Sequence, residues 1–179
     1  LIALIIASLA IVFTAQWWME KSPLNILLFA LFPLISGLAI TPYLLSILAS
    51  YVNAGAILLN ALGATACMAM GAAVFAFTTR MDLSVLSRTL FLSVLGLIAF
   101  SLLQVFIPSL RTGTMELLIT GAGILIFATF TAVDLQRIQR LGKVGANPFM
   151  LALSLYLDIY NLFLYVLRFM LVISGNRRD

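Results

Sequence analysis

Residues 114–174 decide how this chain folds, and they read TMELLITGAGILIFATFTAVDLQRIQRLGKVGANPFMLALSLYLDIYNLFLYVLRFMLVIS. The stretch consists of two apolar segments separated by a short polar loop, residues 142–147, which is followed by Pro148. Each segment is long enough to cross the hydrocarbon core of a bilayer as a helix, which takes about 20 residues. Because the loop between them is short, the two segments are predicted to form an antiparallel helical hairpin.

The rest of the chain has the same apolar character. Of its 179 residues, 64% are hydrophobic and 9% are charged, and the mean hydropathy is +1.19. This balance excludes a water-soluble domain. We therefore predict an all-α, polytopic membrane protein with a single transmembrane domain over residues 1–179. Six spans are expected at about 1–18, 24–45, 53–79, 83–107, 115–140 and 148–174. The second span contains Pro33 and Pro42, so it is expected to be kinked or interrupted.

Basic residues at the ends of the spans predict the orientation of the chain. The breaks after the first, third and fifth spans, together with the span ends beside them, contain six of them, whereas the breaks after the second and fourth spans contain only Arg111. Because cytoplasmic loops are enriched in Lys and Arg, the first set of breaks is predicted to be cytoplasmic. In the break after the third span, Asp82 is expected to cap the following helix. The six basic residues are Lys21, Arg80, Arg88, Arg137, Arg140 and Lys143.

Two acidic residues lie deep within the apolar hairpin. The midpoint between Asp134 and Asp158 is residue 146, in the connecting loop. An antiparallel hairpin therefore places both at about the same depth, roughly 12–18 Å from the turn. An ionisable residue at that depth is a functional candidate by default. Two carboxylates a few ångströms apart cannot both stay ionised at low cost, so we expect this pair to share a proton and to act as a proton sensor.

A stripe of polar side chains runs along the last span with spacings of four, three, four and three residues, which places them on one helix face. Its members are Ser154, Asp158, Asn161, Tyr165 and Arg168. The preceding span has a partly polar face that includes Thr131 and Asp134, and the two faces are expected to meet. Two explanations remain open. The stripe is either the wall of a hydrophilic path or a hydrogen-bonded lock in which Asp134 pairs with Arg137 or Arg140.

The composition also narrows the chemistry. The chain contains no histidine and one cysteine, which argues against a transition-metal site and a His-based catalytic triad. Intramembrane aspartyl proteases use two aspartates on helices, but their Tyr-Asp and Gly-x-Gly-Asp motifs are absent around Asp134 and Asp158. We expect no enzymatic activity and no cofactor. The net charge of +4 arises largely at span ends, so membrane lipids rather than nucleic acid are the expected contacts.

Motifs along essentially the whole chain carry a resemblance to a known family. They are residues 150–163 (MLALSLYLDIYNLF), 167–169 (LRF), 134–138 (DLQRI), 80–84 (RMDLS), and 35–37 (ISG) with Pro42. These motifs resemble those of the Bax inhibitor-1 family. The resemblance implies a membrane protein of seven helices with the last helix enclosed by the other six. The six spans found here would then follow the first helix of the family.

The resemblance further implies a pH-sensitive calcium leak whose proton sensor is a di-aspartyl pair, which falls on Asp134 and Asp158. Both are therefore also candidate Ca²⁺ ligands, since this hard cation prefers carboxylate oxygens. The expected ligands are Ca²⁺ and protons. The supporting residues would be Ser154, Asn161, Tyr165, Arg168 and Thr131.

Two other functions would use the same residues. One is a proton-coupled ion transporter, and the other is a membrane interaction protein that transports nothing. The absence of ER-retrieval and sorting tails favours a bacterial inner membrane over an ER or other organelle membrane.

Overall fold

The computed structural model describes residues 2–175, and the regular structure in this part of the chain is entirely helical. The α-helices are α1 (Ile2–Phe13), α2 (Ala15–Trp18), α3 (Leu24–Ser50), α4 (Ala54–Thr78), α5 (Ser87–Phe106), α6 (Gly113–Leu141) and α7 (Pro148–Ser174). Short 3₁₀ turns are η1 (Leu83–Leu86), η2 (Pro108–Leu110) and η3 (Gly142–Val144). Five of the described helical segments are long and apolar enough to cross a membrane. The prediction of an all-α, polytopic membrane protein is confirmed.

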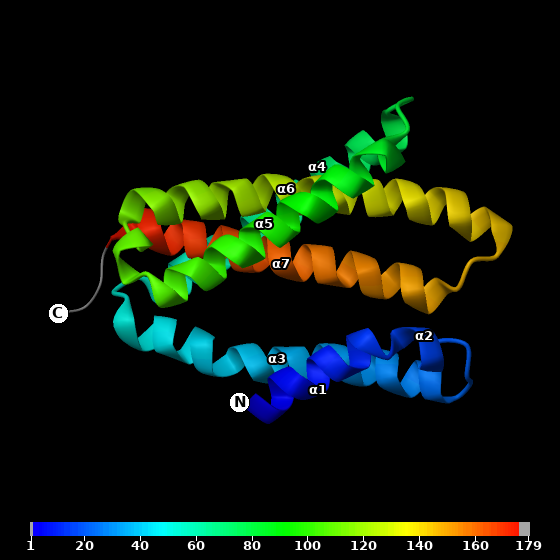
Figure 1. The fold of residues 1–179 in the computed structure, drawn as a ribbon, viewed down its shortest axis with the longest axis horizontal. Coiled ribbons are helices and arrows are strands. Elements are labelled where there is room, and N and C mark those ends of the chain that lie inside the picture. Colours follow the sequence, from blue (N-terminus) through cyan, green and yellow to red (C-terminus); the bar gives the residue numbers. More distant parts are fainter. Residues whose placement is uncertain (1, 176–179) are drawn as a thin grey trace.

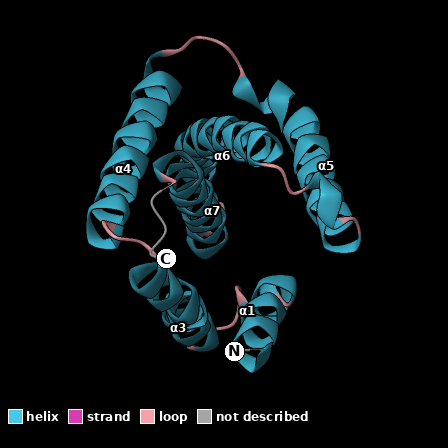
Figure 2. Ribbon diagram, turned by 90° about the vertical axis from the view of Figure 1, so that its left-hand side faces the viewer, coloured by secondary structure: helices cyan, strands magenta, loops and turns pink. Residues whose placement is uncertain are grey.

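The hairpin formed by α6 and α7 lies at the centre of the bundle. Figure 2 shows these two helices side by side, with α1, α3, α4 and α5 around them. In the apolar segments of α6 and α7, 39% and 33% of residues are buried, against 6% to 17% in the other three long segments. The last helix is therefore central, as expected, and α6 shares that position. The peripheral helices leave most of their side chains facing outward, where lipid would contact them.

The loops lie at the two ends of the bundle. The connections formed by residues 19–23, 79–86 and 142–147 gather at one end, at the right of Figure 1. The connections formed by residues 51–53 and 107–112 lie at the opposite end. We call the first the basic end, because the connections there carry Lys21, Arg80 and Lys143. The three loops that the basic residues predict to share one side of the membrane therefore lie at the same end of the bundle.

The first predicted span, residues 1–18, is divided in the structure. α1 ends at Phe13, and α2 begins at Ala15 after a break at Thr14. Side chains compensate the backbone at this break. The Thr14 hydroxyl donates to the carbonyl of Ala10 at 2.6 Å. The buried Trp18 indole donates to the carbonyl of Ile11 at 3.0 Å. A break within an apolar segment is tolerated when its backbone groups keep such partners.

The second predicted span is longer than expected and is not interrupted. α3 continues through Pro33 and Pro42 as far as Ser50 rather than ending at residue 45. A proline removes one backbone hydrogen bond, but a helix in a membrane tolerates this loss where neighbouring groups compensate. Two hydroxyl groups bond to backbone carbonyls of α3 close to the prolines. Ser36 donates to the carbonyl of Pro33, and Thr41 donates to that of Gly37.

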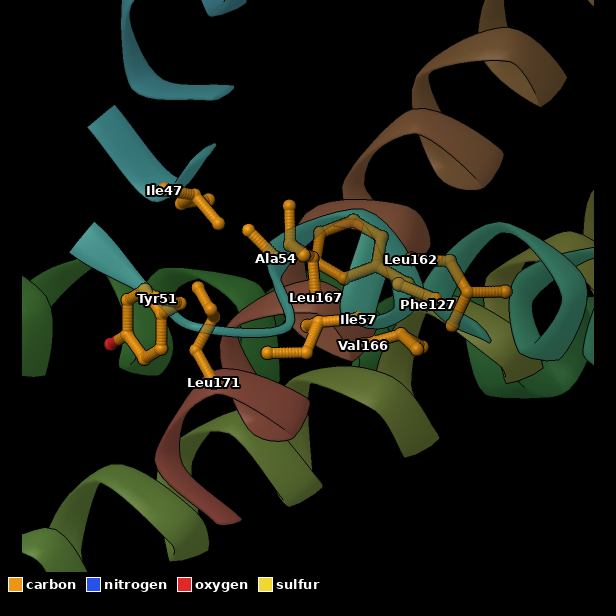
Figure 3. Close-up of a cluster of buried hydrophobic side chains, with 10 residues drawn as sticks. Ile47, Tyr51, Ala54, Ile57, Phe127, Leu162, Val166, Leu167 and Leu171 are labelled. Atoms are coloured by element: carbon orange, nitrogen blue, oxygen red, sulfur yellow. The ribbon is translucent and has the colours of Figure 1, made fainter. Parts of the chain in front are cut away.

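A cluster of buried apolar side chains anchors α7 to its neighbours toward the end opposite the basic end. Figure 3 shows this cluster, which joins α3, α4, α6 and α7. Leu162 and Leu167 of α7 have no exposed surface, and neither does Ala61 of α4. Small side chains on α4 allow it to approach α7 closely. This packing fixes the rotation of α7 and therefore the direction of its polar stripe. Labelled members of the cluster are Ile47, Tyr51, Ala54, Ile57, Phe127, Leu162, Val166, Leu167 and Leu171.

Candidate functional site

The two aspartates of the central hairpin line one cavity. This cavity has a volume of about 580 Å³ and lies between α5, α6 and α7, toward the basic end. Asp134 from α6 and Asp158 from α7 both line it, and they are only 7% and 8% exposed. Ser154, one turn before Asp158 on α7, and Arg137, on α6, line it as well. We call it the di-aspartyl cavity.

A serine and a second carboxyl group contact Asp134 and so tie α6 to α7. The hydroxyl of Ser154 donates a hydrogen bond to Oδ2 of Asp134. The carboxyl groups of Asp134 and Asp158 lie close enough for a direct electrostatic interaction. Asp134, Asp158 and Ser154 therefore lie together, as matched depth and a shared helix face predict.

One oxygen of Asp158 has no partner. Its Oδ2 is buried and receives no hydrogen bond from any N–H or hydroxyl donor in residues 2–175. A buried acceptor without a partner costs about 1–3 kcal/mol, and more if it is charged. A proton shared with Asp134 would give this oxygen a hydrogen bond and would remove the repulsion between two like charges. The arrangement is therefore suited to holding one proton between two carboxyl groups.

The alternative ion pair between Asp134 and an arginine is not observed among the described residues. Arg140 instead bonds to Asp82, with 2.7 Å between Nη1 and Oδ1. Arg137 lines the di-aspartyl cavity without forming a salt bridge in the described part of the chain. The two arginines place positive charge near the cavity, but neither forms a salt bridge with Asp134 or Asp158 in the described part of the chain.

The other predicted supporting residues form no hydrogen bond with the carboxyl groups of Asp134 and Asp158 within residues 2–175. Thr131 is fully buried, and its hydroxyl donates to the carbonyl of Phe127 in its own helix. Asn161 donates to the carbonyl of Leu157, also within its own helix. Together with Asp158 and Tyr165, Asn161 lines a second cavity of about 300 Å³ between α5, α6 and α7. The stripe thus continues from the aspartates toward the middle of the bundle.

The final stripe residue, Arg168, belongs to a different site. Its guanidinium forms an ion pair with Glu116 at the start of α6, at the end of the bundle opposite the basic end. The sequence argument did not identify Glu116, because a single carboxylate near the end of a span is ordinary in membrane proteins. Nor did it identify the close contact at Gly123, where the ring of Tyr165 fills the space that a side chain would need.

A second feature that the sequence argument missed holds η1 against α6 beside the di-aspartyl cavity. The side chain of Gln136 accepts a hydrogen bond from the backbone N–H of Leu83 and donates one to the carbonyl of Met81, each at 2.8 Å. Asp82 caps η1 as expected, by accepting from the N–H of Ser84 at 3.0 Å, and it also bonds to Arg140. Hydrogen bonds from Ser84 and Arg140 hold the pKa of Asp82 below its usual value.

These features define a class of protein: an integral, multi-pass membrane protein with a buried carboxyl pair between its two central helices. Residues 1–176 match the sequence profile of the family described as "Inhibitor of apoptosis-promoting Bax1". The chain belongs to this family, the Bax inhibitor-1 family, as its motifs suggested.

Bacterial proteins are among its relatives. The chain is 31% identical to the inner membrane protein YbhL of Escherichia coli over 189 aligned residues, which cover 99% of this chain and 75% of that protein. It is 34% identical to an uncharacterized protein of Campylobacter jejuni over 159 residues, 89% of this chain and 66% of that protein. A Helicobacter pylori protein is 30% identical over 94% of this chain and 70% of its own length.

Proposed function

We propose that this protein is a pH-sensitive calcium leak channel of a bacterial inner membrane, controlled by a proton that Asp134 and Asp158 share. The observation that carries the proposal is the unpartnered, buried Oδ2 of Asp158 in the same cavity as the carboxyl of Asp134. The assignment to an inner membrane is supported by the name of the Escherichia coli relative.

The proposed mechanism is a competition between a proton and Ca²⁺ for the same oxygens. With one proton between them, Asp134 and Asp158 hold α6 and α7 together by a hydrogen bond. Loss of the proton leaves two carboxylates that repel each other across the interface. It also exposes oxygen ligands that suit Ca²⁺. Ser154 keeps its hydrogen bond to Asp134 in both states and so holds that carboxyl in place.

The cavities around α7 support a route for the cation. The di-aspartyl cavity and the second cavity share Asp158 as a lining residue. Asn161 lines the second cavity and also a third, of about 310 Å³, between α1, α3 and α7. Polar side chains on α7 therefore border successive cavities from the basic end inward. No enzymatic step or cofactor enters this mechanism.

The test is calcium flux through the purified protein in liposomes that contain a calcium-sensitive dye, measured at several pH values. We expect wild-type flux to change with pH, and we expect Asp134→Asn and Asp158→Asn each to abolish that change. Glu20→Gln is the matched control, because Glu20 is an exposed carboxylate in the loop at the basic end. It should keep the wild-type profile.

Three outcomes would contradict the proposal. Wild-type pH dependence retained in both asparagine variants would remove the sensor role. Saturable exchange of Ca²⁺ for protons would indicate a coupled transporter rather than a leak. Absence of flux at every pH would indicate an interaction protein that transports nothing.

A further inference from the structure

A second charged site lies at the end of the bundle opposite the basic end. It occupies a cavity of about 890 Å³ between α3, α6 and α7, which we call the far cavity. Glu116 from α6 and Arg168 from α7 face each other there, with 2.5 Å between Oε2 and Nη2. The remaining polar side chains of the lining are Tyr43, Ser46, Ser50 and Tyr51.

We propose that Glu116 binds a divalent cation at this end of the pathway, and that Arg168 occupies its carboxylate until the cation displaces the guanidinium. The existence of a pathway rests on the proposed channel function, but the binding site itself does not depend on it. The ligand class is a hard divalent cation such as Ca²⁺, because the cavity offers carboxylate and hydroxyl oxygens and no soft ligand.

Glu116 is set apart from the other carboxylates by its position in the bundle. Glu20 and Asp82 lie in loops at the basic end, and Asp134 and Asp158 lie in the di-aspartyl cavity. Within residues 2–175, Glu116 is therefore the carboxylate that a cation arriving from the far end would meet first. Arg168 lies ten residues after Asp158 on the same stripe, about 15 Å along the helix.

The mode of contact also sets Glu116 apart. Glu116 is largely buried, with 17% of its side chain exposed, whereas Arg168 keeps 39% of its side chain exposed. Gln104 of α5, which is 2% exposed, donates to the other carboxylate oxygen at 3.3 Å. The carboxylate is thus fixed by a buried amide, while its cationic partner reaches it from the more open side. Because the carboxylate is largely buried, losing the guanidinium would leave its charge without a partner, and a divalent cation would compensate that charge.

The surrounding charges set the direction of the expected effect. Arg111 lies on the same side, because its Nε donates to the carbonyl of Gln104 at 3.0 Å. The phenol of Tyr43 lines the same cavity as Arg168 and Glu116. With two arginines near one carboxylate, cation binding is opposed in the resting state. Neutralising Arg168 should therefore strengthen binding rather than weaken it.

The test is equilibrium binding of ⁴⁵Ca²⁺ to the purified full chain in detergent, at neutral pH. Arg168→Gln should bind Ca²⁺ more tightly than the wild type by about fivefold or more, because the competing guanidinium is gone and the carboxylate is largely buried. Arg168→Lys keeps the positive charge and is the matched control, so its affinity should remain close to that of the wild type. Adding Glu116→Gln to Arg168→Gln should remove the gain.

A second measurement separates this site from the aspartate pair. The same comparison in the Asp158→Asn background should show the same gain, because that background disables the di-aspartyl cavity. Unchanged or weaker binding in Arg168→Gln, or a gain that survives Glu116→Gln, would overturn the inference.

The two proposals can fail separately. If flux depends on pH but not on Arg168 or Glu116, and if no Glu116-dependent binding is found, only the cation site in the far cavity is refuted. Absence of flux in the wild type refutes the channel, whereas Glu116-dependent binding would still establish the cation site.

Discussion

The tightest contact between the central helices, at Gly123 of α6, leads to a quantitative prediction for Gly123→Ala. A Cβ built at this position overlaps three atoms of the Tyr165 ring on α7. The ring cannot simply move aside, because it stacks on Phe127 with 5.6 Å between ring centroids. Forcing an extra methyl group into such a contact costs about 1–3 kcal/mol. Alanine recovers about 0.8–1.0 kcal/mol of helix propensity. Because the overlap involves three ring atoms, the packing cost should lie in the upper half of its range, about 2–3 kcal/mol, which leaves a net destabilisation of about 1–2 kcal/mol.

The assay is thermal unfolding of the purified protein in detergent, followed by tryptophan fluorescence. A loss of about 1–2 kcal/mol corresponds to a fall in the melting temperature of about 2–8 °C for a protein of this size. Gly96→Ala is the matched control, because a Cβ at position 96 in α5 meets nothing within 4 Å. That change should leave the melting temperature unchanged or raise it slightly through helix propensity.

A double-mutant cycle assigns the loss to the ring itself. In a Tyr165→Ala background the space beside position 123 is free, so Gly123→Ala should no longer destabilise the protein. The reasoning is refuted if Gly123→Ala is as stable as the wild type. It is also refuted if the same loss persists after the ring has been removed.

The loop at the basic end offers two further predictions. Gln136→Leu should destabilise the protein and speed proteolysis of residues 79–86. It removes two hydrogen bonds of 2.8 Å, one from the N–H of Leu83 and one to the carbonyl of Met81, worth about 1 kcal/mol each. Unchanged cleavage would show that Gln136 does not hold this loop. Asp82→Asn should lower stability at neutral pH but not at acidic pH. The folded pKa of Asp82 lies below 3.8, so its contribution is present above that value and is lost as the pH falls through the lower, folded pKa. If the variant remains less stable than the wild type at a pH below the folded pKa of Asp82, the ionised carboxylate is not the cause of the difference.

The aspartate site could be predicted from the sequence because an antiparallel hairpin converts spacing into depth. Positions symmetric about residue 146 lie level with each other, and Asp134 and Asp158 are such a pair. The same rule pairs Tyr165 with Phe127, and these two rings stack in the structure. Apolar composition predicted the helical fold in the same direct way. These successes depend only on helix rise and on the shortness of one loop.

The rule failed where a side chain forms its hydrogen bond within its own helix or reaches a partner at another depth. Thr131 and Asn161 donate to carbonyls four residues earlier in their own helices, a choice that spacing does not reveal. Arg168 is level with residue 124 by the symmetry rule, yet it bonds to Glu116, two turns farther along α6. Long charged side chains extend toward polar surroundings, so their partners are not fixed by backbone depth.

The same limit explains the differences between the predicted and the observed helices in the first two spans. Hydropathy averaged over a window measures how apolar a segment is, but not whether its backbone hydrogen bonds are complete. The break at Thr14 depends on one hydroxyl and one indole N–H, and the continuity of α3 depends on what surrounds two prolines. Both effects come from side chains or tertiary contacts, and the segment is equally apolar with or without them.

The arrangement of contacts along the central hairpin explains why a carboxyl pair can persist there. Close packing at Gly123 and Tyr165 fixes the separation of α6 and α7 in the middle of the bundle. The pair of Asp134 and Asp158 lies on one side of this contact, and Glu116 with Arg168 lies on the other. In the mechanism we propose, two carboxyl groups held by a rigid scaffold cannot relieve their repulsion by drifting apart, so a proton or a cation would relieve it. On this proposal, the rigidity of the apolar contact is what makes the polar site responsive.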